Sequence, residues 1–224
     1  MANNDSETVS NKATVMILLI VVGLSLAYAV VRYNVVRHVP LNNLPLYISN
    51  KALALAATLL IGLSFVLGPL ARFFPKLIPH LYLRKRLGVS GFWVAAIHAV
   101  ISLAILTPAY YPRLFEKSGK MTWQGESFLL FGILAFLVFG AISLASLPPV
   151  EEKMDAKQWK SVQRLGYLAY GFVLLHVGLL GYRGWSSANN YKYGMASITL
   201  IAAIFIVFVL LMRVLVAVFP KKSR

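Results

Sequence analysis

Six apolar runs, each long enough to cross a lipid bilayer, make up most of this chain of 224 residues. A helix needs about 20 apolar residues to span the hydrocarbon core, and 59% of the residues are hydrophobic while only 13% are charged. The connections between the runs are too short to form a soluble domain. The sequence therefore predicts an all-α integral membrane protein, a six-helix bundle with spans at residues 14–33, 52–71, 87–109, 126–147, 164–183 and 193–218.

Short polar tails flank this helical domain of residues 14–218, at residues 1–13 and, with basic character, at 219–224. We interpret the first run as a retained helix and not a cleaved leader, because its N-terminal flank carries Asp5 and Glu7 as well as Lys12. With the N-terminus inside, the inner segments hold fourteen of the 22 lysines and arginines. The positive-inside rule then predicts cytoplasmic N and C termini in a multi-pass plasma-membrane protein, with the bacterial inner membrane as the expected location.

The net charge of +15 follows from this loop bias and from contact with anionic membrane lipid, so it does not indicate nucleic-acid binding. Cysteine is absent. This excludes iron–sulfur clusters and the covalent attachment of c-type haem, so any haem in this chain is held non-covalently.

Two of the runs share a frame that a generic membrane helix has no reason to keep. The residues Arg-Leu-Gly at 86–88 precede His98, and the same three at 164–166 precede His176, with each histidine twelve residues after the arginine. At the rise of an α-helix, both imidazoles lie about 18 Å from that arginine. The third and fifth spans cross in the same direction, so the two imidazoles meet at one level. This geometry clamps a haem iron from both sides.

Ionisable side chains are costly inside a bilayer and are usually functional. The alternative for His98 and His176 is that each is a neutral, structural imidazole hydrogen-bonded to a neighbouring helix. Gly91, Ala95 and Ser102 share the helix face of His98 and predict a shallow trough in which a porphyrin could lie. Ordinary packing of small residues between helices is the alternative for that face.

The frames from residue 84 to His98 and from Trp159 to His176 resemble the ferric reductase-like transmembrane domain. Its superfamily includes the MsrQ/YedZ-like haem subunits and the STEAP metalloreductases, and the resemblance covers roughly residues 50–183. It implies a six-helix bundle with b-type haem ligated from the third and fifth helices. Two-haem members carry a second histidine 13 residues before each of this pair, where this chain has Lys85 and Gln163. The resemblance therefore implies one bis-histidine haem b, in the outer half of the membrane.

The sequence contains no G-x-G-x-x-G nucleotide fingerprint, so we expect electrons to come from a separate donor, a flavoprotein or a quinol. In STEAP-like proteins a flavin fills the inner half of the bundle beside a single haem. The residues here that could hold the phosphate or ring edge of FAD or FMN are Arg84, Lys85, Arg86, Gln163 and Arg164. A quinone in the same cavity is the other candidate, and simple anchoring at the membrane surface is the alternative for the basic residues.

The chain shows neither paired carboxylates nor a nucleophile beside a base, so we assign no catalytic residue. The sequence predicts a transmembrane b-type cytochrome, the electron-transfer subunit of a reductase. It would pass electrons from the inner donor through one haem to an outer acceptor, either a periplasmic reductase or a metal ion. The alternative is a haem-free membrane scaffold or transporter subunit with structural histidines.

Overall fold

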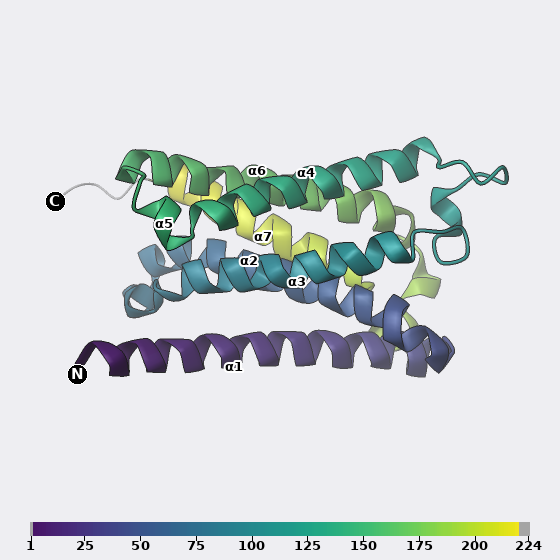
Figure 1. Cartoon of the computed structure of the whole chain (residues 1–224). Coiled ribbons are helices and arrows are strands. Elements are labelled where there is room, and N and C mark those ends of the chain that lie inside the picture. The colour runs from purple at the N-terminus through teal and green to yellow at the C-terminus, as the bar shows by residue number, and fades with distance from the viewer. Residues whose placement is uncertain (1, 220–224) are drawn as a thin grey trace.

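The computed structural model describes residues 2–219, with side chains from residue 11 onward. It is a bundle of long helices aligned along one axis (Figure 1). Within the described residues six helices are long and apolar enough to cross a membrane, which confirms the predicted all-α, six-span fold. The long helices are α1 (Ala2–Val30), α2 (Ser49–Phe73), α3 (Leu83–Ala104), α4 (Trp123–Ala145), α6 (Ala156–Trp185) and α7 (Ile198–Val218). The connections contain η1 (Val31–Val36), η2 (Leu41–Asn43), η3 (Leu44–Ile48), η4 (Pro75–His80), η5 (Pro112–Leu114), α5 (Pro148–Glu151), η6 (Ala188–Asn190) and η7 (Lys192–Gly194).

Polar caps set the starts of three spans. The side chains of Thr122, Asp155 and Ser197 accept hydrogen bonds from the first free amides of α4, α6 and α7, which have no partner inside the helix. At Asp155 the Gln158 side chain completes a capping box. Thr122 and Asp155 lie before the predicted runs, so α4 and α6 begin earlier than predicted, whereas Ser197 lies inside the predicted run 193–218, so α7 begins later than predicted.

The ends of the predicted spans differ from the ends of the observed helices by several residues. The third span ends at Ala104 and not at residue 109, because the chain leaves the helix ahead of Pro108, whose ring disfavours helical backbone in the residue before it. Residues 2–13, predicted as a polar tail, continue the first helix. Of the predicted basic tail, residues 220–224 lie outside the described part of the chain.

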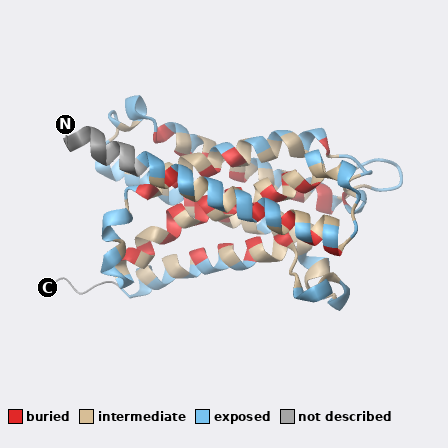
Figure 2. Cartoon of the chain, turned by 90° about the horizontal axis from the view of Figure 1, so that it is seen from below, coloured by how far each residue is buried: buried red, intermediate tan, exposed pale blue. Residues whose placement is uncertain are grey.

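The centre of the bundle is α2, which packs against α1, α3 and α7, while α6 packs against α4 and α7. In the most apolar stretch of the span that contains α2, 61% of the residues are buried, against 17–28% in the other spans. Figure 2 shows the buried residues concentrated where the helices face one another. The two helices that carry the predicted histidines, α3 and α6, are thus held mainly by different neighbours, α2 and α4.

A fully buried tyrosine helps to set the position of α6 relative to α2 along the bundle axis. The Tyr170 hydroxyl donates a hydrogen bond of 2.8 Å to the Thr58 carbonyl. Gly62 leaves room for this contact, because a Cβ at that position would lie 2.4 Å from the Tyr170 oxygen. Since Tyr170 lies in the same helix as His176, this bond also fixes the depth of that histidine.

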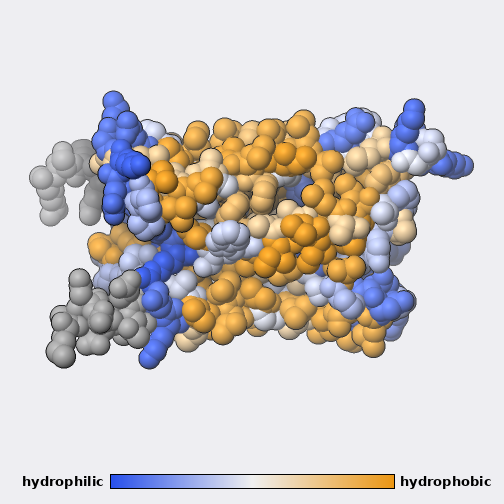
Figure 3. Space-filling model, viewed as in Figure 1, coloured by the Kyte–Doolittle hydropathy of each residue, from blue (hydrophilic) through white to orange (hydrophobic). Residues whose placement is uncertain are grey.

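The surface is divided as a bilayer requires, with an apolar band between two hydrophilic ends (Figure 3). Both α3 and α6 start at the end of the bundle where α5 lies and run in the same direction (Figure 1). We call that end inner, following the orientation predicted from the loop charges, and the opposite end outer. The parallel relation that the histidine hypothesis requires is therefore present.

Candidate functional site

His98 extends from α3 toward the outer start of α2. Its Nδ1 lies 2.8 Å from the side-chain oxygen of Asn50 and 3.2 Å from the main-chain oxygen of the same residue. Asn50 is 1% exposed, and its amide nitrogen donates to the Ser102 hydroxyl at 2.9 Å. Because both nearby Asn50 atoms are acceptors, we place the ring proton on Nδ1, which leaves the Nε2 lone pair unprotonated. The Ser102 oxygen, 3.5 Å from Nε2, is at the limit of a hydrogen bond.

His176 extends from α6 toward α4 and is held in a similar way. Its Nδ1 lies 2.9 Å from the main-chain oxygen of Phe128, so this nitrogen also carries the proton. The Phe128 ring stacks on the imidazole with centroids 4.0 Å apart. Gly132 leaves room for the ring, because a Cβ at that position would lie 2.8 Å from Nδ1. The position and tautomer of this imidazole are therefore set by one helix, α4.

The two imidazoles are close enough to act on each other electrostatically. Each has its Nδ1 bonded to an oxygen and presents Nε2 as a potential ligand. Histidines that bind metals usually show this pattern, in which an outer hydrogen bond fixes the ring and makes it a better donor. Two such nitrogens are the donors that a bis-histidine haem would require.

The small residues predicted to form a porphyrin trough are placed differently. At Gly91 a Cβ would lie 2.7 Å from an Ile61 side-chain carbon, so α2 covers this position. Ala95 packs against the cluster of buried residues that α2 and α3 share. At these two positions the structure matches the packing alternative. Ser102 instead belongs to the histidine site through Asn50.

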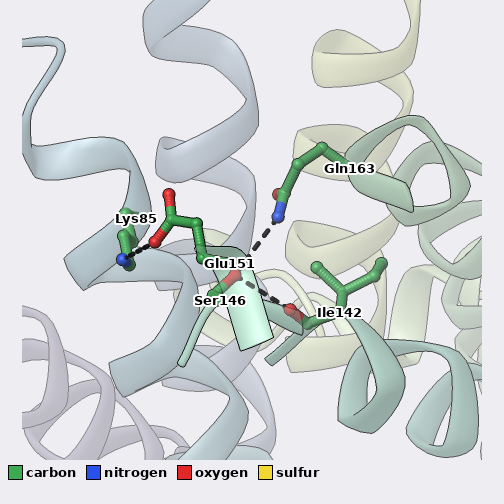
Figure 4. Close-up of polar contacts among 5 residues, drawn as sticks. All are labelled: Lys85, Ile142, Ser146, Glu151 and Gln163. Carbon is green, nitrogen blue, oxygen red and sulfur yellow. Dashed lines mark hydrogen bonds and ion pairs between the residues drawn. The ribbon is translucent and has the colours of Figure 1, made fainter. Parts of the chain in front are cut away.

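At the inner end, the residues predicted to hold a second cofactor do not all converge. Lys85 forms an ion pair with Glu151 of α5, and the Gln163 amide donates to the Ser146 hydroxyl at 3.2 Å (Figure 4). Both therefore contact the segment that joins α4 to α6. Arg86 instead bonds Asn11 of α1, and Arg164 is exposed.

A second pair of cations lies nearby, around Tyr167 of α6. The Arg213 guanidinium of α7 lies 5.3 Å from the centroid of the Tyr167 ring, and Arg84 of α3 also acts on this tyrosine electrostatically. Arg84 is fixed by a hydrogen bond of 3.0 Å to the Ser64 carbonyl and packs against Gly68. The inner end thus has basic groups from α3 and α7 beside an aromatic ring, a suitable set for an anionic or planar ligand.

Comparison with known proteins bears on this arrangement. The family described as "Ferric reductase like transmembrane component" matches residues 53–174. The chain belongs to this family. The match includes His98 and ends just before His176.

Curated relatives of this ferric reductase-like chain include Metalloreductase STEAP2 of Mus musculus and of Homo sapiens, 25% and 26% identical over 78% of this chain and 43% of each relative. Metalloreductase STEAP3 of Rattus norvegicus is 25% identical over 67% of this chain and 36% of its own length. The chain thus spans less than half the length of these relatives. Family and relatives support a transmembrane oxidoreductase-type role in electron transfer.

Three contributors to the histidine site of this ferric reductase-like chain were not predicted from its sequence. Asn50 could have been found as a polar residue just before the apolar run 52–71. Gly132 is one of several glycines in apolar runs, and nothing local distinguishes it. Phe128 contributes its main-chain oxygen, which leaves no signal in the side-chain sequence.

Proposed function

We propose that the chain is a b-type cytochrome that carries electrons across the membrane through one bis-histidine haem b. The observation that supports this proposal is the geometry of His98 and His176. They come from parallel helices, lie close enough to act on each other electrostatically, and each has Nδ1 hydrogen-bonded to an oxygen. Haem, when bound, supplies one-electron transfer between ferric and ferrous iron.

The chain's own residues would hold the haem and set its surroundings. Asn50 and the Phe128 carbonyl keep the proton of each imidazole on Nδ1, so both Nε2 lone pairs stay available as ligands. Phe128 and Gly132 restrict the rotation of His176. Because these groups sit on packed helices, the two donors are pre-positioned and need little rearrangement on binding.

The inner end is the proposed place of the electron donor, either a flavin or a quinol. The cations there, Lys85, Arg84 and Arg213, suit the phosphate of FMN or FAD, and Tyr167 offers a ring face. A quinol would use the same polar groups as hydrogen-bond partners. We further propose a bacterial inner membrane as the location and, on the outer side, a metal ion or a periplasmic reductase as the acceptor. The printed name of the relatives, metalloreductase, favours the metal ion.

The alternative is a haem-free scaffold or transporter subunit with structural histidines. It has one specific observation in its favour, because each imidazole does hydrogen-bond a neighbouring helix, His98 to α2 and His176 to α4. The two functions differ in what Nε2 does. A structural histidine needs no ligand at that atom, whereas an axial ligand needs it free.

A pyridine haemochrome assay on purified protein, combined with protein quantitation, separates the two functions. The cytochrome should give one haem b per chain and a Soret band that sharpens and shifts when dithionite is added. Protein that stays colourless, both as purified and after haem supplementation during expression, would reject the cytochrome in favour of the scaffold.

A further inference from the structure

A lysine at the outer end of α2 is surrounded by aromatic rings from three different segments. The Lys51 ammonium lies 4.4 Å from the ring centroid of Tyr47 in η3, 5.4 Å from Tyr33 in η1 and 5.8 Å from Tyr111 in the loop after α3. These distances are those of cation–π contacts, which stabilise an ammonium group that has lost water. Lys51 is half-buried, and the proposed electron path does not by itself account for it.

This cation has no carboxylate beside it. In residues 11–219, whose side chains are described, the only ion pair joins Lys85 to Glu151, at the opposite end of the bundle. Tyr111 does not serve as a counter-ion, because burial raises the pKa of its hydroxyl and keeps it neutral. Ring faces offer partial negative charge but do not neutralise an ammonium, so the site has a place for an anion.

Lys51 and the tyrosines around it adjoin the candidate haem site. Lys51 follows Asn50, the residue that bonds His98, and the lysine charge acts electrostatically on the His98 ring. Tyr111 interacts with the Asn50 side chain as well as with Lys51. An anion that neutralises Lys51 therefore lies at the edge of the site formed by His98 and His176.

We propose that Lys51 binds a carboxylate at this edge, and that the carboxylate is a propionate side chain of haem b. The inference rests on the proposed cytochrome function, because haem b is the group that would bring propionates next to His98. A cation in this position has two effects. It holds the haem in one orientation, and it favours the ferrous state, which carries one positive charge less than the ferric state.

The first test is the midpoint potential of the haem in the holoprotein, measured by spectroelectrochemistry. Lys51→Met keeps the length of the side chain and removes its charge, and it should lower the potential by about 59 mV, a tenfold change in the reduction equilibrium. Lys51→Arg should keep the potential of the wild type. The matched control is Lys192→Met, an exposed lysine of the outer loop in η7, which should leave the potential unchanged.

The second test identifies the source of the carboxylate. Protein from haem-deficient cells is loaded with haem b or with its dimethyl ester, in which both propionates are capped. If Lys51 pairs with a propionate, the ester raises the potential of the wild-type protein, and Lys51→Met shifts the potential by a different amount in the ester-loaded protein than with haem b, because the two changes are coupled. If Lys51→Met fails to fold, Lys51→Gln, which also removes the charge, takes its place with both haems.

Three results would overturn the inference. Lys51→Met that shifts the potential equally with haem b and with the ester would reduce Lys51 to a distant charge. Lys51→Met that leaves the potential unchanged but slows reduction of citrate-chelated ferric iron would assign the carboxylate to the acceptor. If Lys51→Met and the ester both leave the midpoint potential unchanged, the proposed carboxylate site is rejected. Failure of the wild type to bind either haem is distinct, because it rejects the proposed function itself.

Discussion

The outer and inner levels of the bundle use the same two helices, α3 and α6, but carry different chemistry. At the outer level His98 and His176 are each held through Nδ1 by a neighbouring helix. Thirteen residues earlier, about 20 Å along the helices, Lys85 and Gln163 are held by Glu151 and Ser146 of the segment between α4 and α6. The outer level presents nitrogen lone pairs suited to iron, whereas the inner level presents hydrogen-bond donors suited to an anion or a polar ring edge.

This difference is what two proposed cofactors of different kinds would require. A ligand site needs side chains whose protons are fixed away from the metal, and the outer oxygens of Asn50 and Phe128 achieve that. A phosphate or ring-edge site needs cations and amides that can exchange partners, and the half-exposed pair of Lys85 with Glu151 has that freedom. The following predictions test whether the two levels are separate in function.

The largest expected effect is the loss of haem when either outer ligand is removed. His98→Ala and His176→Ala should each abolish the low-spin spectrum, because an iron with one axial imidazole is no longer six-coordinate, and should lower the amount of haem retained per chain. The measurement is the ultraviolet–visible spectrum of purified protein with the pyridine haemochrome assay.

His38 and His80 are the controls for this prediction. Both are exposed, as expected from their lack of a partner at metal-ligand spacing. His38→Ala and His80→Ala should retain one haem per chain. The reverse pattern, with haem lost in the controls and kept in His98→Ala or His176→Ala, would show that the ligands are assigned wrongly.

A smaller effect is expected at Asn50, which holds His98 without touching the metal. Asn50→Leu leaves His98 Nδ1 only the longer contacts of 3.2 Å to the main-chain oxygen and 3.4 Å to the Ser102 hydroxyl, and loss of such an outer partner lowers affinity by about tenfold or more. Asn50→Asp should rescue haem binding and lower the midpoint potential, because an anionic acceptor makes the imidazole a stronger donor. Haem titration and spectroelectrochemistry measure both quantities.

Gln124→Leu is the matched control for Asn50→Leu. Gln124 is a buried amide of α4 that bonds the Leu179 carbonyl and contacts neither histidine in the described structure. Its replacement should affect stability but not haem affinity or potential. Equal losses of haem in Gln124→Leu and Asn50→Leu would mean that the effect comes from any buried polar change and not from His98.

The space provided by Gly132 should have a still smaller effect. Gly132→Ala places a Cβ 2.8 Å from His176 Nδ1 and forces the ring to turn. A displaced rotamer costs about 1 kcal/mol, which corresponds to about a fivefold loss of haem affinity. Gly171→Ala in α6 is the control, because a Cβ there meets no atom within 4 Å. If both variants bind haem as the wild type does, His176 is free to relax and Gly132 has no role in positioning it.

The sequence predicts the fold well because the length of an apolar run is a local property. All six spans are present, and the parallel course of the third and fifth follows from counting crossings. The errors fall at span ends, where a cap such as Thr122 or a proline such as Pro108 decides and hydropathy does not.

The candidate site is predictable only in part, for a related reason. His98 and His176 stand out because a repeated frame places two ionisable groups at one depth. The residues that hydrogen-bond or pack against these histidines do not stand out. The positions of α2 and α4 along the bundle axis depend on packing between residues that are distant in the sequence. Gly91 shows the same limit, since a small residue on the face of His98 fits a porphyrin or a helix equally well in sequence, and in the structure α2 covers it.

The smallest effects on stability and on the haem are expected at the inner level, where the variants test the role of Lys85. Its ion pair with Glu151 is between side chains 40% and 36% exposed, and such a pair contributes less than about 1 kcal/mol to stability. Lys85→Met and Glu151→Gln should therefore lower the thermal stability equally and slightly. Neither should change the spectrum or the potential of the haem, about 20 Å away along the helix.

Binding of FMN to the two variants should separate them if the inner level receives a flavin. Lys85→Met removes a charge-assisted partner of the phosphate, so FMN affinity measured by fluorescence quenching should fall by about tenfold or more. Glu151→Gln removes the carboxylate that competes for Lys85, so affinity should stay equal or rise. Equal affinities in both variants would make Lys85 a structural cation that only ties α3 to α5. Absence of FMN binding in the wild type would leave the quinol as the donor at this level.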